Sequence, residues 1–287
     1  MLLQRIITAL ILVPLVVLAV FQLPSEYFSL LAALITLLAA WEWTNLIGIN
    51  SLFKRGLFLL MLILPMLWLH LWTQFLEVMA QVLDWPDIRD YSGALEWLVV
   101  PPVLFWILAM ILIGNVPAAV LKLEMKIRYK ALIGWLVLLA TWMFLSRLRA
   151  FYGSELTLYF LILIWAADIT AYFTGKKFGK TQLSAEISPG KTVQGMYGAL
   201  IAGVVCAGVL SLIYGFPWMV ASDFIMLSVL TVLISIYGDL FFSVVKRQRG
   251  VKDTGSILPG HGGVLDRIDS LIAAIPFFYA GIILIHP

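Results

Sequence analysis

The sequence predicts an all-α, polytopic integral membrane protein with about nine transmembrane helices. The mean hydropathy is +1.02, and only 12% of the 287 residues are charged. One core of this size could not bury so much apolar surface, so a water-soluble domain is excluded. Lipid cannot satisfy the hydrogen-bonding groups of an open sheet edge, so the long apolar runs are expected to be helices.

Nine apolar runs define the predicted helices. They lie at about residues 6–23, 28–43, 57–73, 97–113, 131–145, 156–172, 195–214, 224–245 and 268–285. Some runs are slightly shorter than the roughly 20 residues that span the hydrocarbon, so their ends are placed to within about two to four residues. The sequence has no internal repeat and no low-complexity tail, and we predict a single membrane-embedded domain over residues 1–287.

The distribution of positive charge orients these helices. All but three of the 19 Lys and Arg residues lie at the amino terminus or in loops that an even number of predicted crossings separates from it. The exceptions are Arg89, Arg147 and Arg149. Because positively charged loops stay in the cytoplasm, the amino terminus is predicted to be cytoplasmic and the carboxyl terminus to lie outside. No small-residue cleavage site follows Phe21, so the first run is expected to be a helix rather than a cleaved signal peptide.

Residues 243–269 concentrate charge in this apolar chain. The segment SVVKRQRGVKDTGSILPGHGGVLDRID contains five basic residues, three aspartates, a histidine and five glycines. Several cations together suit a substrate that carries several phosphates, and aspartate oxygens are ligands that Mg²⁺ prefers. The segment therefore predicts a site for a polyphosphate and a magnesium ion, on the cytoplasmic side.

Two further aspartates lie inside apolar runs, near their cytoplasmic ends: Asp168 in the sixth run and Asp239 in the eighth. An ionisable group in a membrane helix costs about 2.5–3.5 kcal/mol on insertion scales and is usually retained for function. The alternative is a side chain that reaches the interface or bonds a neighbouring helix. Asp239, Ser243 and Lys246 are spaced i, i+4 and i+7, which places them on one helix face. Such a column is suited to a metal at its deeper end and a phosphate at its outer end.

The sixth loop supplies a second predicted anion-binding element, ISPGKTVQG at residues 187–195. Ser188 is expected to cap the next helix with Pro189 in its first turn, and Lys191 and Thr192 to point donors at a phosphate. The GKT triplet is not a Walker A motif, because that motif needs a further glycine and a preceding buried strand. The alternative is a capped helix start that carries a surface lysine.

Two residues of the charged segment have alternative interpretations. His261 stands among glycines, which indicates a tight turn whose amides approach phosphate oxygens, but a lone histidine is equally a structural hydrogen-bonding group. Arg249 is expected to be a solvated or lipid-facing charge rather than a substrate contact.

The pattern resembles the signature of the CDP-diacylglycerol synthase, or phosphatidate cytidylyltransferase, family. The residues that carry the resemblance are Ser243, Lys246, Arg247, Lys252, Asp253, Pro259, His261, Gly262, Gly263, Asp266, Arg267 and Asp269. Segments that look similar to the same family are 165–180, 188–195 and 238–240. Residues 1–115 carry little family signal beyond hydrophobicity and AWEW at 40–43, so residues 116–287 are expected to hold the catalytic helices and cytoplasmic loops.

The resemblance implies magnesium-dependent transfer of a cytidylyl group from CTP to phosphatidic acid, which forms CDP-diacylglycerol and pyrophosphate in phospholipid biosynthesis. Its implied catalytic residues are Asp239, Lys246 and Asp266, with Asp239 and Asp266 as metal ligands and Asp168, Asp253 and Asp269 as additional ones. The implied substrate contacts are Lys191, Ser243, Arg247, Lys252, His261, Gly262, Gly263 and Arg267. The resemblance further implies a homodimer among membrane lipids, in the inner (cytoplasmic) membrane, with no nucleic-acid partner.

Three other functions remain open at this point. A cation-coupled transporter would explain Asp168 and Asp239 but not the cation-rich segment, and the sequence lacks the inverted repeats that would favour it. A lipid-binding scaffold would explain the basic loops but not the intramembrane carboxylates. A related CTP-dependent enzyme acting on a polyprenyl or ether lipid fits the same motifs, because apolar helices do not specify the lipid tail.

Overall fold

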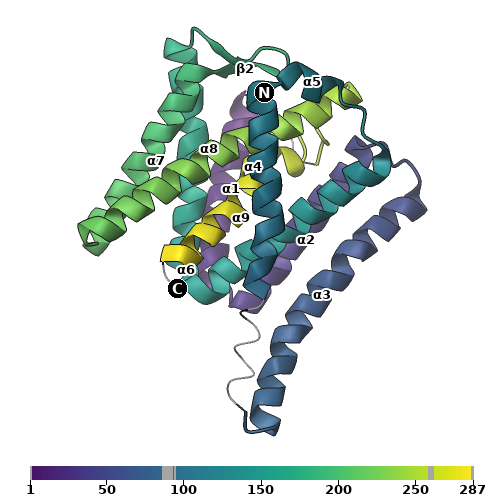
Figure 1. Ribbon diagram of the computed structural model, residues 1–287, viewed down its shortest axis with the longest axis vertical. Helices are drawn as coiled ribbons and strands as arrows, with labels where there is room; N and C mark the ends of the chain where they lie inside the picture. Colours follow the sequence, from purple (N-terminus) through teal and green to yellow (C-terminus); the bar gives the residue numbers. More distant parts are fainter. Residues whose placement is uncertain (1, 86–92, 94, 258–261, 286–287) are drawn as a thin grey trace.

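The computed structural model describes residues 2–85, 93, 95–257 and 262–285, and these form a bundle of helices with one small hairpin (Figure 1). In chain order the elements are α1 (Leu2–Gln22), α2 (Ser25–Leu46), α3 (Leu52–Val82), α4 (Val100–Asn115), α5 (Pro117–Lys122), α6 (Ile127–Phe178), β1 (Gln182–Ser184), β2 (Ser188–Thr192), α7 (Val193–Tyr214), α8 (Trp218–Arg249) and α9 (Leu265–Ile285). Seven helices are long and apolar enough to span a membrane, and α1 contributes a shorter apolar stretch, Leu10–Gln22. The predicted all-α polytopic membrane protein is confirmed.

The 52-residue helix α6 contains two of the predicted apolar runs, 131–145 and 156–172. It is interrupted at Gly153, whose φ of 84° and ψ of 178° are open to glycine and costly for other residues. Figure 1 shows its two halves as separate rods that meet at a bend. With α6 counted as two segments, each of the nine predicted runs coincides with a helical segment.

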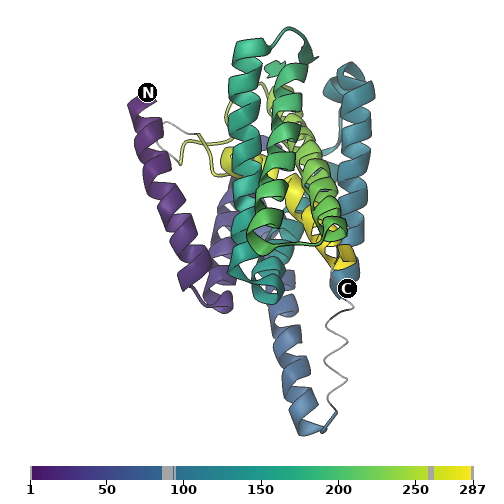
Figure 2. The ribbon, with the colours of Figure 1, turned by 90° about the vertical axis from the view of Figure 1, so that its left-hand side faces the viewer.

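Helix α3 continues further than predicted. The third apolar run was predicted to end at about residue 73, but the helix ends only at Val82. Leu76 and Ala80, one turn apart, are 3% and 4% exposed, so this part of α3 has a buried apolar face that favours helix. Figures 1 and 2 show α3 as a long rod whose later part extends beyond the other helices.

The ends of the chain lie toward opposite ends of the long axis. Figure 2 places the start of α1 near the end that also carries the hairpin, whereas α9 runs away from it. A chain that crosses the membrane an odd number of times is expected to have its two ends on opposite sides.

Close packing of small residues brings the site-bearing helices together. A Cβ on Gly238 of α8 would overlap Ala273 of α9, and one on Gly195 of α7 would lie 2.8 Å from the carbonyl oxygen of Ala171 in α6. Membrane helices associate through such small residues, because van der Waals contact replaces the hydrophobic effect in lipid. The first of these contacts sets the distance between Asp239 and the start of α9.

The hairpin corrects one prediction. Ser188 does not cap a helix: it begins β2, which pairs antiparallel with β1. The cap is Thr192, whose hydroxyl accepts a hydrogen bond from the Gly195 amide at 3.1 Å. Pro189 is compatible with the strand because a two-stranded sheet has only edge strands, where a missing N–H is tolerated.

Candidate active site

Six predicted residues from four elements meet at the end of the bundle that carries the hairpin. They are Asp168 in α6, Lys191 in β2, Asp239 and Lys246 in α8, and Asp266 and Asp269 in α9. We refer to these six residues as the carboxylate–lysine cluster.

An ion pair joins the hairpin to α8. Nζ of Lys191 lies 2.5 Å from Oδ2 of Asp239, and the Ser243 hydroxyl lies 3.5 Å from Oδ1 of the same carboxylate. The side chains of Lys191 and Asp239 are 24% and 31% exposed. Asp239 and Ser243 share a helix face as predicted, because they are four residues apart. The carboxylate is therefore neutralised by a cation and still accessible to a ligand.

A second ion pair, between α8 and α9, is more deeply buried. Nζ of Lys246 lies 2.8 Å from Oδ1 of Asp266 and 3.9 Å from Oδ2 of Asp269. The Lys246 and Asp269 side chains are 12% exposed and that of Asp266 is 6% exposed. Buried charges of this kind persist only when they are paired, so each of these groups depends on its partner.

Asp168 reaches the cluster from α6. It is exposed, Ser270 donates a hydrogen bond to it, and the charges of Asp239 and Lys191 act on it. Three helices thus direct carboxylates toward the region beside Lys191.

Residues of the glycine-rich segment, which we define as residues 250–263, contact Asp266. Oδ2 of Asp266 accepts hydrogen bonds from the Thr254 amide at 2.8 Å and the Gly263 amide at 3.1 Å, and it lies 3.0 Å from the Thr254 hydroxyl, whose single proton is shared with Glu42. Gly262 has a φ of 84°, and a Cβ there would lie 3.0 Å from the same oxygen. Both oxygens of Asp266 are therefore engaged by protein donors, and ligation of a metal through Oδ1 requires Lys246 to move.

The remaining predicted residues lie around this cluster. Those with exposed positions are Arg247, Lys252, Asp253 and Arg267. Nε of Arg247 donates to the carbonyl of Ile187 at 3.3 Å, which ties the end of α8 to the hairpin. His261 and Pro259 lie outside the described residues, so the role assigned to His261 stays a prediction.

The carboxylates of the carboxylate–lysine cluster suit a magnesium ion that is bound partly by the protein and partly by substrate. Within the part of the chain that the structure describes, no three His, Cys, Asp or Glu side chains are arranged to hold a metal ion by themselves. Mg²⁺ usually binds one or two carboxylates and completes its shell with waters and substrate phosphates. Among the three predicted ligands that pair with a lysine, Asp239 is the best placed, because its side chain is 31% exposed, against 6% for Asp266 and 12% for Asp269.

The structure adds one residue that the sequence analysis did not single out, Glu42 near the end of α2. Its side chain contacts the same glycine-rich segment and the start of α9, through hydrogen bonds from the Thr254 hydroxyl and from the amides of Val264 and Leu265. Glu42 lies in the apolar run 28–43, so the cost of an ionisable group in a membrane helix was a signal available in the sequence.

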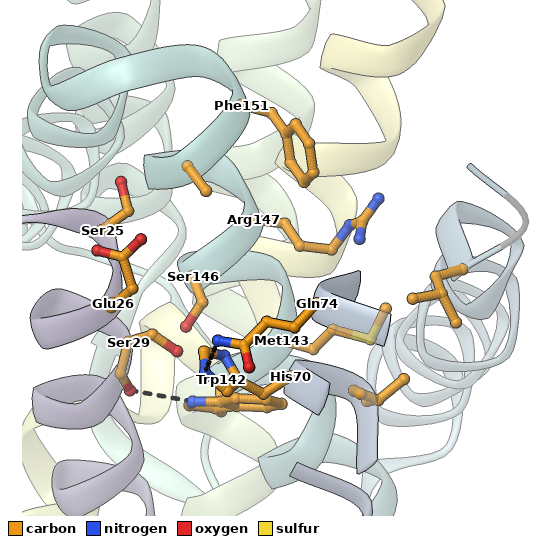
Figure 3. A pocket seen from close by; sticks show the side chains of 13 residues that line it. Ser25, Glu26, Ser29, His70, Gln74, Trp142, Met143, Ser146, Arg147 and Phe151 are labelled. Carbon is orange, nitrogen blue, oxygen red and sulfur yellow. Dashed lines mark hydrogen bonds between the residues drawn. The ribbon is translucent and has the colours of Figure 1, made fainter. Parts of the chain in front are cut away.

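A separate cavity lies at the other end of the bundle. It has a volume of about 220 Å³ and is bounded by α2, α3 and α6, with Glu26, His70, Ser146 and Arg147 among its lining residues (Figure 3). Glu26 and Glu42 are on the same uninterrupted helix, about 24 Å apart at a rise of 1.5 Å per residue. The cavity is therefore remote from the carboxylate–lysine cluster.

Fold and site together define an integral membrane protein with a cluster of acidic and basic side chains at its helix ends. The chain belongs to the cytidylyltransferase family, whose model matches residues 3–285. It is a nucleotidyltransferase, which decides against the transporter and scaffold alternatives.

Two curated relatives match nearly the whole chain. The chain is 36% identical to the phosphatidate cytidylyltransferase of Haemophilus influenzae over 290 residues, covering 97% of each chain. It is 38% identical to that of Pseudomonas aeruginosa over 281 residues, which is 98% of this chain and 96% of the relative. A third similarity, 43% over 131 residues, is to the phosphatidate cytidylyltransferase of Bacillus subtilis and covers 45% of this chain and 47% of the relative.

Proposed function

We propose that this enzyme transfers a cytidylyl group from CTP to phosphatidic acid and releases pyrophosphate, with Mg²⁺ as its cofactor. The observation that carries the proposal is the pair of lysines held against aspartates in the cluster, Lys191 on Asp239 and Lys246 on Asp266. The relatives in Haemophilus influenzae and Pseudomonas aeruginosa are phosphatidate cytidylyltransferases, which supports the choice of acceptor.

The reaction needs no nucleophile from the enzyme. The second pKa of a phosphate monoester is about 6, so the phosphate of phosphatidic acid is largely dianionic at neutral pH. One of its oxygens forms a bond to the α-phosphorus of CTP while the bond from that phosphorus to the β-phosphate oxygen breaks, and pyrophosphate leaves with the electron pair. The protein has to hold two anions together and offset the charge that develops between them.

The bound metal would supply charge neutralisation on the triphosphate and orient it for in-line displacement. We assign Asp239 as its first protein ligand and Asp266 as its second, with Asp168, Asp253 and Asp269 as the other candidate carboxylates. The protein oxygens needed for a shared magnesium site are therefore present on α8 and α9.

The two lysines have a further role in this proposal. In the structure Lys191 and Lys246 offset the charge of the carboxylates. When substrate and cation bind, we propose that each ammonium turns from its carboxylate to a phosphate oxygen, so that both lysines clamp CTP. Lysine suits this exchange because its charge sits on a flexible stem with rotatable donors.

The remaining parts of the proposal concern location and assembly. The positively charged loops favour a cytoplasmic site in the inner membrane, because such loops are retained on that side. A homodimer is proposed from family resemblance alone.

A substrate panel tests the proposed function. Purified protein in detergent is incubated with Mg²⁺ and CTP, and with phosphatidic acid, a polyprenyl phosphate or an archaeal-type ether lipid phosphate as acceptor. We expect a CDP-lipid from phosphatidic acid at a rate at least 100-fold above the other two. Faster reaction with a polyprenyl or ether lipid would replace the proposed acceptor, and no nucleotide-linked lipid from any acceptor would refute the proposal.

A further inference from the structure

Glu42 is a buried carboxylate in the AWEW motif at residues 40–43, outside the catalytic region predicted at residues 116–287. The residue is 3% exposed and lies one turn before the end of α2. Oε1 accepts a hydrogen bond from the Val264 amide at 3.0 Å, and Oε2 accepts from the Leu265 amide at 2.8 Å and the Thr254 hydroxyl at 3.0 Å. The two amides lie at the start of α9, where helix N–H groups have no intrahelical partner. Glu42 therefore acts as an N-terminal cap of α9 supplied by a distant helix.

The glycine-rich segment is shaped to admit this carboxylate. A Cβ on Gly263 would overlap Oε2 of Glu42, and a Cβ on Gly255 would lie 2.5 Å from Oε1. Real Cβ atoms do not approach a neighbour so closely, so the absence of side chains at these two positions makes room for Glu42. Glu42 therefore occupies space that a side chain at either glycine would fill.

Thr254 connects Glu42 to the carboxylate–lysine cluster. Its hydroxyl lies 3.0 Å from Oε2 of Glu42 and 3.0 Å from Oδ2 of Asp266, and its amide donates to the same Asp266 oxygen at 2.8 Å. Asp266 in turn pairs with Lys246 at 2.8 Å. A short chain of polar contacts thus runs from α2 through Thr254 to the Asp266–Lys246 pair.

We propose that Glu42 is a positioning residue for cytidylyl transfer. It fixes the segment around Thr254 and the start of α9, so that the side chains of Asp266 and Lys246 are held in the positions needed to bind substrate. The proposal rests on the proposed function of the cluster. It gives the amino-terminal helices a direct part in the site, although Glu42 touches neither Asp266 nor Lys246 itself. The negative charge is required as well as the shape, because a helix N-terminus carries partial positive charge and all three partners of Glu42 are donors.

Glu42→Gln is the most direct variant. Glutamine keeps the shape, but one of its two acceptor atoms becomes an amino group that faces a backbone amide or a hydroxyl, so at least one donor loses its partner. We expect kcat to fall at least about 10-fold and the Mg²⁺ concentration for half-maximal activity to rise, because Asp266 is no longer held in place. The matched control is Glu26→Gln, the same change in an exposed residue at the other end of α2, which should leave both quantities unchanged.

Hydrogen exchange gives a readout that does not depend on activity. The Val264 and Leu265 amides donate directly to Glu42, so exchange in a peptide covering residues 262–268 should accelerate at least about 10-fold in Glu42→Gln. Exchange in α7, which does not contact Glu42, should stay the same. Uniformly faster exchange with a lower melting temperature would make Glu42 a general stabilising residue and overturn the proposal.

Thr254→Val decides the case if Glu42→Gln does not fold. Valine is nearly isosteric and removes only the hydroxyl that lies between the two carboxylates. We expect a kcat reduction in the same direction and, in the double variant, a loss smaller than the product of the two single losses, because both changes break one connection. Wild-type activity in every single variant that folds, including Thr254→Val alone, would overturn the proposal. If wild-type enzyme made no CDP-lipid at all, the proposed function would fail, whereas the exchange measurement would still test whether Glu42 holds the segment.

Discussion

Lys191 and Asp239 form an ion pair between the hairpin and α8, with Nζ and Oδ2 2.5 Å apart. The two residues come from different predicted motifs, the sixth loop and the eighth helix. Their contact joins the phosphate-binding element to the carboxylate best placed for a metal. The hairpin is therefore part of the same site as the charged segment rather than a second anion-binding surface.

Asp239→Asn should lower turnover by at least about 100-fold while the protein remains folded. An amide keeps the side-chain volume but removes the charge that both Lys191 and a metal ion require. Activity is measured in detergent with CTP, phosphatidic acid and graded Mg²⁺, and folding by size-exclusion chromatography and thermal melting. Near-normal turnover would exclude Asp239 as an essential ligand, and activity that survives thorough chelation would exclude the metal itself.

Lys191→Ala should cut kcat/KM for CTP by roughly 10- to 100-fold, the value of one charge-assisted hydrogen bond to a phosphate. The matched control is Lys180→Ala, which removes an exposed lysine just before the hairpin. It should change kcat/KM only a few-fold, and the change should shrink as salt is added. Equal losses in the two variants would mean that the hairpin attracts CTP as a diffuse basic patch.

A similar comparison applies to α8. Lys246→Ala should reduce catalytic efficiency by at least about 10-fold, because it leaves Asp266 and Asp269 without their buried cation. Arg249→Ala, at the exposed end of the same helix, should have a few-fold, salt-dependent effect. Comparable losses would contradict the assignment of one polar face of α8 to the site.

The contact between α8 and α9 predicts a difference between two glycines. Gly238→Ala places a Cβ into Ala273 beside Asp239, and overpacking of this kind costs about 1–3 kcal/mol. Gly208→Ala in α7 meets no atom within 4 Å and should be neutral or stabilising, since alanine is favoured over glycine in a helix. Melting temperature and turnover should both fall in the first variant only. A stable, fully active Gly238→Ala would show that this contact does not set the position of Asp239.

Hydropathy and the charged motifs were sufficient to predict the helices and most residues of the candidate site. Nine apolar runs matched helical segments, because a long apolar run in lipid is expected to be a helix. The spacing of Asp239, Ser243 and Lys246 predicted their common face from the helical period. The hairpin was missed because Ser188 and Pro189 favour a helix start locally, while pairing with β1 and the cap at Thr192 are decided by contacts across the loop.

The partners of the site residues could not be predicted for a similar reason. Lys246 was expected to face a phosphate, whereas in the structure it pairs with Asp266, from a helix that only the fold brings alongside α8. Glu42 lies more than 200 positions before the amides that it binds. A single sequence holds no information on such a distance, although the charge inside an apolar run marks Glu42 as unusual.

Membrane topology is tested by labelling. Single cysteines are introduced at position 87 and at position 256 in a Cys206→Ala background; Ser256 is exposed. The two cysteines should react with an impermeant maleimide from opposite sides of sealed vesicles. An odd number of predicted crossings separates the two positions, and the basic loops favour the cytoplasm for the second. Labelling of both from one side would overturn the predicted nine crossings and the cytoplasmic site.

The fate of the individual phosphates of CTP tests the central claim most directly. Purified enzyme is given Mg²⁺ and phosphatidic acid with CTP labelled at either the α- or the γ-phosphate. Cytidylyl transfer predicts that α-label enters the lipid fraction in a one-to-one ratio with pyrophosphate, and that γ-label appears only in pyrophosphate. Release of α-label as free CMP, or of γ-label as inorganic phosphate with no labelled lipid, would show hydrolysis and contradict the account.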